Sequence, residues 1–188
     1  MNFSWDFYGA IKGVFNGQSA SKIASTHNNE YNSTPAGKQW VRYTTNHDES
    51  AWDATPISLF NGIDGATAAS VVTIFTGGVP LIYGSQEVGT ANTVPFFTNS
   101  TIDWNANPDM LAAYQKILQF YSSSATARKG DNKFYSNSNV FCLRKTIDND
   151  QVVVIVNVRN ETINYSVPAD LKNTNWTNIM TGNSMDLG

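Results

Sequence analysis

The densest group of chemically reactive side chains is the run Asn46–Glu49 (Asn-His-Asp-Glu), which directly follows the strand-like residues Trp40–Thr44. If that strand belongs to a parallel β/α sheet, the run lies at the edge where the connecting loops converge. A fixed carboxylate there can stabilise a developing positive charge, and a neutral imidazole can donate a hydrogen bond to a hydroxyl group. The same spacing also fits an ordinary loop in which Asp48 caps a following helix. Spacing alone leaves both interpretations open.

The elements that must position this run alternate between helices and strands over about the first 120 residues. Helices are predicted over Phe7–Phe15, where apolar residues recur at helical spacing, over the mostly polar Ser19–Tyr31, over Ala66–Thr76, and over the amphipathic Pro108–Tyr121. The third of these is apolar nearly all round, which is typical of a helix buried on several sides. Short apolar strands are predicted at Trp40–Thr44 and Val79–Tyr83, with Asn2–Trp5 as a candidate third strand. This order predicts parallel β/α units.

The pattern changes from about Arg128, after which the apolar runs are short and bounded by turn residues. These runs predict strands at Lys133–Tyr135, Val140–Lys145, Gln151–Val158, Thr162–Val167 and Trp176–Met180. Asp148–Asp150 and Arg159–Asn160 are predicted hairpin connections. The sequence therefore predicts a small antiparallel β-sandwich that begins near Ser122–Lys129.

Composition excludes several classes of function. Charged residues make up only 14% of the chain and the formal net charge is −3, so we expect no nucleic-acid partner, which would need clustered Lys and Arg. The abundance of Asn, Ser and Thr suits a neutral, hydroxylated partner such as a carbohydrate. The single cysteine, Cys142, excludes a disulfide framework and a multi-cysteine zinc site, and we expect it to be buried. No stretch reaches the roughly 18 apolar residues of a membrane helix, and Met1–Asp6 does not resemble a signal peptide.

Two or three parallel strands cannot by themselves bury both faces of a sheet or pair both of its edges. We therefore expect the β/α part to be the end of a larger closed sheet, and the chain to be an excerpt that lacks the N-terminal part of its own barrel.

Three motifs in a fixed order carry a resemblance to a known family. They are Tyr43–Glu49 (Tyr-Thr-Thr-Asn-His-Asp-Glu), Gly78–Tyr83 (Gly-Val-Pro-Leu-Ile-Tyr) and Gln86–Gly89 (Gln-Glu-Val-Gly). This order resembles the α-amylase family of glycoside hydrolases, and Ile102–Trp104 is similar to that family's passage towards its C-terminal domain. The resemblance implies an α/β fold: a partial (β/α)8 TIM barrel, from strand six to strand eight, in residues 1–125, followed by an all-β antiparallel sandwich in residues 126–188 that is truncated at its end.

The resemblance also implies roles for individual residues. Asp48 matches the family's transition-state-stabilising aspartate, and His47 matches the histidine that binds the same sugar. Asn46 either holds the shape of the loop or touches substrate, and Trp52 either stacks on a sugar or packs under the loop. Glu87 is expected to brace the loop after strand eight. Before the Gln-Glu pair the family more often has glycine, where this chain has Ser85.

The activity implied for the parent protein is retaining hydrolysis of α-1,4-glucosidic bonds in starch or maltooligosaccharides. Its nucleophilic aspartate and acid/base glutamate belong to motifs that would lie upstream, so we expect this chain alone to be inactive. No metal or other cofactor is expected in this segment, although calcium is common in the family. The amino-acid sequences of these motifs are most similar to those of bacterial starch-degrading members of the family. This resemblance implies that the parent protein is exported from the cell.

Two other classes of function remain open from the sequence. A non-catalytic starch-binding module could use aromatic side chains of the β-sandwich as a stacking platform. A metal-dependent phosphohydrolase could use His47 and Asp48, but it needs further ligands, and the only other histidine is His27.

Overall fold

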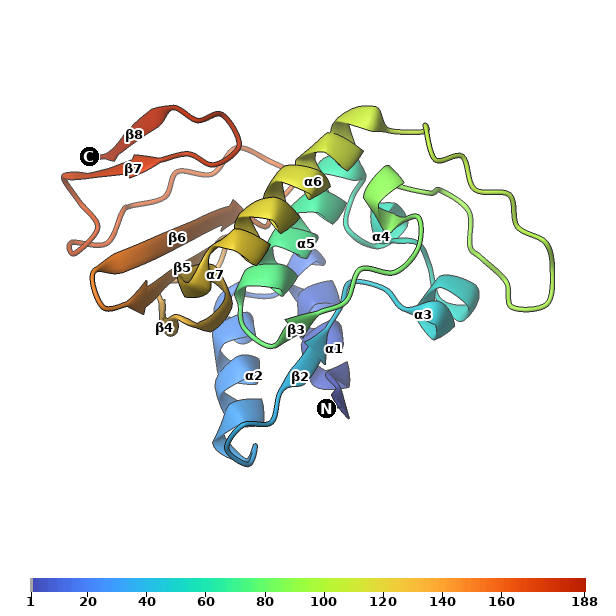
Figure 1. Cartoon of the computed structure of the whole chain (residues 1–188), viewed down its shortest axis with the longest axis horizontal. Coiled ribbons are helices and arrows are strands. Elements are labelled where there is room, and N and C mark those ends of the chain that lie inside the picture. The colour runs from blue at the N-terminus through green and yellow to red at the C-terminus, as the bar shows by residue number, and fades with distance from the viewer. Residues whose placement is uncertain (1) are drawn as a thin grey trace.

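The computed structural model describes residues 2–188, which form a mixed α/β structure with three small sheets. The first sheet contains β1 (Asn2–Phe3), β2 (Trp40–Arg42) and β3 (Val79–Pro80), with β2 in the centre and all strands parallel (Figure 1). The expectation of parallel strands is therefore confirmed. The third strand is shorter than predicted. After Pro80 the N–H of Leu81 still donates to the carbonyl of Arg42, at 2.7 Å, but the N–H of Tyr83 donates to Gln86 Oε1 at 2.9 Å instead of to a strand.

All four predicted helices are present. The helices are α1 (Trp5–Phe15), α2 (Ser21–Asn32), α3 (His47–Trp52), α4 (Pro56–Leu59), α5 (Ile63–Phe75), α6 (Pro108–Ser123) and α7 (Ala125–Lys129), with a 3₁₀ turn η1 (Gln86–Val88). Helix α5 lies in the middle of the molecule and contacts β3, α6 and strand β6 (Asp150–Asn157) of the C-terminal part (Figure 1). Contacts on several sides explain why its sequence is apolar nearly all round.

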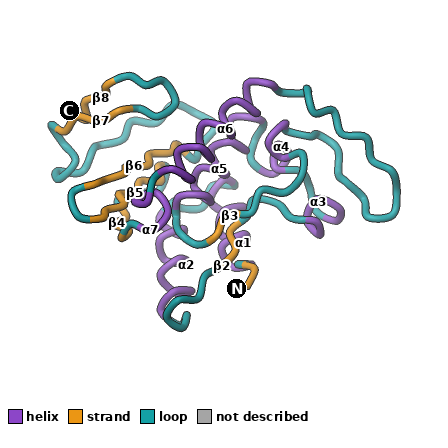
Figure 2. The backbone as a smooth tube through the Cα atoms, viewed as in Figure 1, coloured by secondary structure: helices purple, strands orange, loops and turns teal. Residues whose placement is uncertain are grey.

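The C-terminal part is antiparallel, as predicted. One sheet contains β4 (Asp131–Phe134), β5 (Val140–Ile147) and β6 (Asp150–Asn157), and the other contains β7 (Thr174–Thr177) and β8 (Ser184–Leu187) (Figure 2). Ile147 pairs with Asp150, so a two-residue turn joins β5 to β6, and Asp148 in that turn has a φ of 51°. This confirms the first predicted hairpin.

Two predictions for the C-terminal part are wrong. Residues 162–167, all of them described, form no strand, because Tyr165 and Val167 pack over the sheet face that carries Cys142 instead of pairing at its edge. Arg159 is not in a hairpin connection either. Its guanidinium donates to the carbonyls of Val14 at 2.6 Å and Gln18 at 2.7 Å, which anchors the irregular segment after β6 to the end of α1.

The central antiparallel sheet is covered on both faces because its side chains alternate. Phe141 and Leu143 of β5 belong to a large apolar cluster that also contains residues of α1, α5 and α6. Cys142 points the other way and packs with Leu171 and Leu187, fully buried as expected. The β/α part and the β part therefore share one continuous core, while the boundary between residues 125 and 126 stays a prediction.

A buried ion pair holds the first sheet in place. Arg42 of β2 is completely buried and is paired with Glu30 of α2. Its guanidinium also donates to Ser4 Oγ at 2.6 Å and to the carbonyl of Gly77 at 3.1 Å, and it lies 3.3 Å from His27 Nδ1. One side chain thus connects β2 to the start of α1, to α2 and to the end of α5.

A second buried cation continues this network into the β part. The ammonium of Lys145 on β5 donates to Asn132 Oδ1 at 2.9 Å, and the Asn132 amide donates to the carbonyl of Thr76 at 2.6 Å and lies 3.3 Å from His27 Nε2. Burial lowers the pKa of Lys145 to about 8, and the nearby carboxylate of Asp131 offsets only part of this effect.

We predict that Arg42→Met lowers the free energy of unfolding by about 3–5 kcal/mol, because it leaves the carboxylate of Glu30 buried without its partner. Urea unfolding followed by circular dichroism measures the effect. Lys172→Met, which removes an exposed cation, is the matched control and should change stability by less than about 0.5 kcal/mol. Equal effects of the two substitutions would contradict a structural role for the ion pair.

A pH dependence follows from Lys145. Its pKa is about 8 in the folded protein, against an ordinary value of 10.5 for a solvated lysine, so between these values the unfolded chain binds more protons. The stability of the wild type relative to Lys145→Met should therefore rise from pH 8 to pH 10 and stay flat from pH 6 to pH 7.5. Urea titrations of both proteins across this range test the prediction, and a difference that does not change with pH contradicts it.

Candidate functional site

The predicted site residues lie where β2 leads into the short helix α3. Thr44, Thr45 and Asn46 are buried, and α3 begins at His47. The side-chain oxygen of Asn46 accepts hydrogen bonds from the N–H groups of Asp48 at 2.9 Å and Glu49 at 3.0 Å. Asn46 is therefore the N-cap of α3 and holds the shape of the loop, and the interpretation of Asp48 as the cap is wrong.

Because Asn46 caps the helix, the next two side chains are free to face solvent. The side chain of His47 is 56% exposed and that of Asp48 is 49% exposed, and His47 Nε2 lies 3.5 Å from Asp48 Oδ1. The structure thus presents a carboxylate and an imidazole next to each other on one surface, both accessible to a ligand.

The other end of α3 is fixed to α1. Asp53 follows the helix, and its carboxylate accepts hydrogen bonds from Lys12 at 2.7 Å and Tyr8 at 3.1 Å. Burial alone would raise the pKa of Asp53, but the hydrogen bond and charge of Lys12 outweigh it and hold that pKa below its ordinary value. Both ends of α3 are therefore anchored while its outer face stays open.

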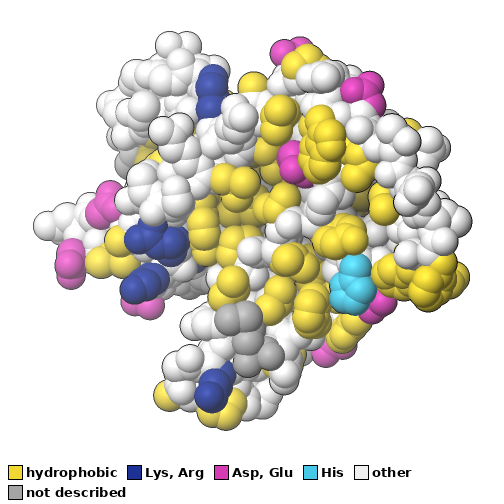
Figure 3. All heavy atoms as spheres, turned by 45° about the vertical axis from the view of Figure 1, so that its right-hand side comes forward, with side chains coloured by type: hydrophobic (Ala, Val, Ile, Leu, Met, Phe, Trp, Pro, Cys, Tyr) yellow, Lys and Arg dark blue, Asp and Glu magenta, His cyan; other side chains and the backbone are white. Residues whose placement is uncertain are grey.

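Aromatic side chains adjoin this face. Trp52 is 73% exposed and meets Phe96 edge-on at 5.7 Å between ring centroids, and Phe96 lies 6.0 Å from the ring of His47. Figure 3 shows apolar side chains gathered beside a histidine on this side of the molecule. Trp52 does not pack under the loop, so of its two predicted roles only stacking on a ligand agrees with its position.

The loop after β3 is braced by a residue that the sequence analysis did not single out. Gln86 is buried, accepts a hydrogen bond from the N–H of Tyr83 at 2.9 Å and donates to Thr44 Oγ1 at 3.1 Å and to the Tyr114 hydroxyl at 3.2 Å. Glu87 is the expected brace, yet within residues 2–188 its buried Oε2 has no hydrogen-bond partner. The only signal in the sequence for Gln86 is its position beside Glu87 in the motif.

The structure contains no candidate metal site within residues 2–188: no three His, Cys, Asp or Glu side chains are grouped there. His27 contacts Arg42 and Asn132 in the buried network around β2, so it adds no ligand to His47 and Asp48, and the phosphohydrolase interpretation gains no support. Over the same residues, no helix has the length and apolar character needed to cross a membrane.

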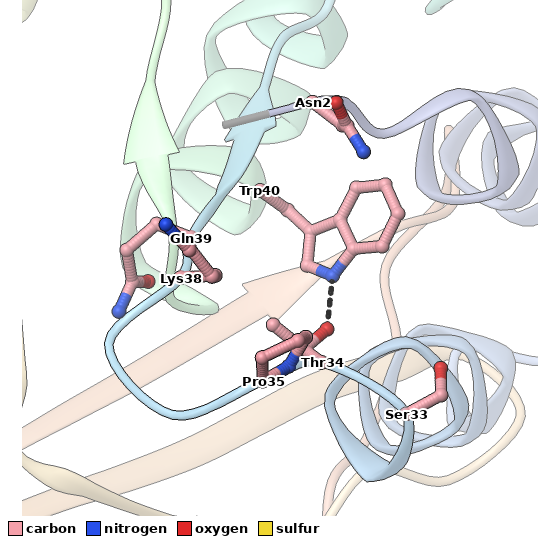
Figure 4. Close-up of a pocket in the computed structure, with 7 residues that line it drawn as sticks. All are labelled: Asn2, Ser33, Thr34, Pro35, Lys38, Gln39 and Trp40. Atoms are coloured by element: carbon pink, nitrogen blue, oxygen red, sulfur yellow. Dashed lines mark hydrogen bonds between the residues drawn. The ribbon is translucent and has the colours of Figure 1, made fainter.

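A hollow of about 370 Å³ lies at the opposite end of the strands (Figure 4). It is lined by Asn2, Ser33, Thr34, Pro35, Lys38, Gln39 and Trp40, and the indole N–H of Trp40 donates to Thr34 Oγ1 at 2.8 Å. Asn2 and Trp40 begin β1 and β2, whereas His47 and Asp48 follow the end of β2. The hollow is therefore separate from the candidate site.

Comparison with solved structures identifies the fold. The structure of AmyP in complex with maltose matches 98% of this chain with a TM-score of 0.76 at 15% identity, and the match covers 45% of that chain. The maltogenic α-amylase AmyB from Thermotoga neapolitana matches 97% of this chain with a TM-score of 0.74 at 16% identity, again over 45% of its own chain. The fold is that of α-amylase-family proteins.

A third match extends the resemblance. The cyclic α-maltosyl-(1→6)-maltose hydrolase from Arthrobacter globiformis, in complex with maltose, matches 82% of this chain with a TM-score of 0.70 at 18% identity, over 36% of its own chain. The chain thus spans less than half the length of these three structures. No protein-family model and no curated protein matches the sequence. The resemblance inferred from the motifs is therefore confirmed at the level of the fold.

The backbone at Ser85 leads to a testable prediction. Ser85 has a φ of 71°, in the left-handed region that favours glycine, which explains why the family's pattern more often has glycine there. We predict that Ser85→Gly raises the free energy of unfolding by about 0.5–1 kcal/mol, because relief of strain exceeds the extra entropy of glycine in the unfolded chain. Ser85→Ala removes the hydroxyl but not the strain, so in urea unfolding it should not stabilise; stabilisation by both would contradict the explanation.

Proposed function

We propose that this chain is the C-terminal portion of a retaining α-glucan hydrolase that cleaves α-1,4-glucosidic bonds in starch or maltooligosaccharides. In this proposal residues 1–125 form the last βα units of a (β/α)8 barrel, and residues 126–188 form its C-terminal β-sandwich domain. The observation that carries it is the exposed pair His47 and Asp48 at the end of a parallel strand, in a fold shared with α-amylase-family proteins.

The exposed face of α3 suits one side of a binding site for a glucose unit. The Asp48 carboxylate accepts hydrogen bonds from sugar hydroxyls and stabilises positive charge that develops at the anomeric carbon during cleavage. The imidazole of His47 donates to a hydroxyl of the same sugar, and the indole of Trp52 stacks on a sugar face. Because the helix is fixed at both ends, these groups do not need to be reorganised as the substrate reacts.

The pair of carboxylates that breaks the bond must come from elsewhere. A retaining glycosidase needs two carboxyl groups roughly 5–5.5 Å apart, one of them a nucleophile. The acidic neighbours of Asp48 do not fit, since Glu49 and Asp53 both face Lys12 at the base of the helix. We therefore propose that the nucleophile and the acid/base lie upstream, and that this chain alone is inactive.

The first sheet supports the proposal of an incomplete barrel. Within residues 2–188, β1 and β3 each pair on one side only, and Phe3 and Val79 on these strands are exposed. Open edges of a parallel sheet are normally paired or covered. The missing N-terminal part of the same barrel is the proposed partner. Export of the parent protein from the cell is part of this proposal. A calcium site, common in the family, would belong mostly to the upstream part of the parent.

The alternative of a starch-binding module is less well supported. It would use aromatic side chains of the β part, but these pack in or against the two apolar clusters: Phe134, Tyr135, Phe141, Tyr165 and Trp176. Trp52 and Phe97, 73% and 90% exposed, instead both contact Phe96, whose ring lies 6.0 Å from that of His47. Their position favours a site built around the carboxylate of Asp48.

The test is hydrolysis of soluble starch by the parent polypeptide, with its upstream sequence, and by its Asp48→Asn variant. Loss of the fixed charge should lower kcat by about 100-fold or more without unfolding the protein. Asp186→Asn, which removes a carboxylate on the distant strand β8, is the matched control and should keep full activity. Release of reducing sugar measures the rates, and circular dichroism confirms the fold.

The results separate the possible outcomes. If the parent cleaves starch and Asp48→Asn cleaves it equally well, the assignment of Asp48 is wrong. If the parent cleaves no α-glucan, the proposed activity is wrong and only the fold remains. Cleavage of starch by residues 1–188 alone would contradict the proposal that the bond-breaking pair lies upstream.

A further inference from the structure

Two phenylalanines on the surface have no structural role that explains their exposure. Phe96 and Phe97 lie in the irregular segment between η1 and α6, which projects from the molecule beside α3 (Figures 1 and 2). Phe97 is 90% exposed and Phe96 is exposed as well. Large apolar side chains grouped on a surface mark a binding site more often than a fold requirement. We call Phe96 and Phe97 the aromatic arm.

The aromatic arm forms a row with the candidate site. Phe96 stands in the middle, 6.0 Å from Phe97 and 5.7 Å from Trp52, with interplanar angles of 67° and 68°. The same ring lies 6.0 Å from His47. Because the contacts of Phe96 with Phe97 and Trp52 are edge-to-face, they do not stack the rings on one another, and flat faces remain for a ligand.

The arm is attached to the same helix that carries Asp48. The N–H of Val94 donates to the carbonyl of Ser50 in α3 at 2.9 Å, two residues before Phe96. At the far end of the segment, the Asn107 amide donates to the carbonyl of Val88 at 2.6 Å. The position of the arm relative to His47 and Asp48 is therefore set by hydrogen bonds.

The charges around the arm restrict what it can bind. Between Tyr43 and Gln115 the sequence contains no Lys or Arg, while Asp48, Glu49 and Asp53 lie in and after α3. Lys12 reaches α3, but it is already paired with Asp53 at 2.7 Å. A nucleic acid, a phosphorylated ligand or an anionic membrane would need cations here. A pyranose ring is neutral, has an apolar C–H face that fits an aromatic ring, and carries hydroxyls that the neighbouring carboxylate and imidazole can bind.

We infer that Phe96 and Phe97 bind a glucose unit of an α-glucan chain, beyond the unit held at His47 and Asp48, and so make the protein prefer longer chains. This inference rests on the proposed function and deepens it. A chain that crosses from Asp48 over Phe96 to Phe97 occupies the arm, whereas a disaccharide held at Asp48 does not reach Phe97.

The experiment titrates the 188-residue chain with maltoheptaose, maltose and, as a β-linked probe, cellohexaose, by isothermal calorimetry. Phe97→Ala and Phe97→Leu should weaken maltoheptaose binding about fivefold, because neither keeps a flat ring, and Phe97→Tyr should restore it. None of the three should change the binding of maltose. Ile155→Ala, which truncates an exposed apolar side chain on β6, is the control and should bind like wild type.

Several results would overturn the inference. They are undetectable binding of maltoheptaose, equal affinity of wild type and Phe97→Ala, equal binding of cellohexaose, and a drop in maltose affinity as large as that for maltoheptaose. Analytical sedimentation of wild type and Phe97→Ala shows whether Phe97 mediates self-association instead. Self-association through Phe97 in a protein that does not bind maltoheptaose would also overturn the inference. The proposed function fails separately. Absence of starch cleavage by the parent polypeptide would refute the activity, and cleavage that does not depend on Asp48 would refute the role of that residue. Either result would leave glucan binding at Phe97 to stand.

Discussion

A buried positive charge at Arg42 constrains the rest of the structure. A guanidinium taken out of water is strongly destabilising unless carboxylate and carbonyl groups surround it. Here the acceptors come from separate elements, namely the carboxylate of Glu30 in α2, the hydroxyl of Ser4 before α1 and the carbonyl of Gly77 after α5. The three elements must therefore keep their places around β2 for the charge to be satisfied. Since β2 is the central strand of the first sheet, its neighbours on both sides are positioned by the same constraint.

The constraint reaches both the β part and the site. Burial, together with the charges of Arg42 and Lys145, lowers the pKa of His27 to about 3, so a neutral imidazole can lie beside Arg42 and contact Asn132 of β4. A charged imidazole there would be repelled by two cations. In the other direction, the buried residues after Arg42 lead straight to the N-cap at Asn46. The exposed face of α3 is thus joined to the most buried charge in the described chain by only a few residues.

Sequence reasoning succeeded where a local pattern decides the structure. The local composition and spacing of residues located α1, α2, α5 and α6, and the turn at Asp148 located the β5–β6 hairpin. It failed where a distant partner decides. The pattern around Arg159 predicts a turn, but its guanidinium binds a carbonyl at the end of α1. Tyr165 was predicted in a strand, but it covers a sheet face because Cys142 and Leu171 lie beneath it. In the site, the motif located Asn46, His47 and Asp48, but no spacing rule brings Phe96 next to Trp52, since a loop without periodicity connects them.

The exposed and the buried polar groups of this structure carry different parts of the proposed chemistry. Asn46, Gln86 and Asp53 make their hydrogen bonds within the protein, so they fix the positions of α3 and of the loop after β3 and are not needed to bind a ligand. His47 and Asp48 face solvent, and their remaining hydrogen-bonding capacity is available to a substrate. A site that is already ordered before binding loses less conformational entropy when the substrate arrives. If upstream residues supply the bond-breaking carboxylates, the geometry of the opposite side of the site, with His47 and Asp48, is already set by Arg42 and by the hydrogen bonds at both ends of α3. Selection among glucans of different length can then be made by the aromatic arm, without any change at the atoms that react.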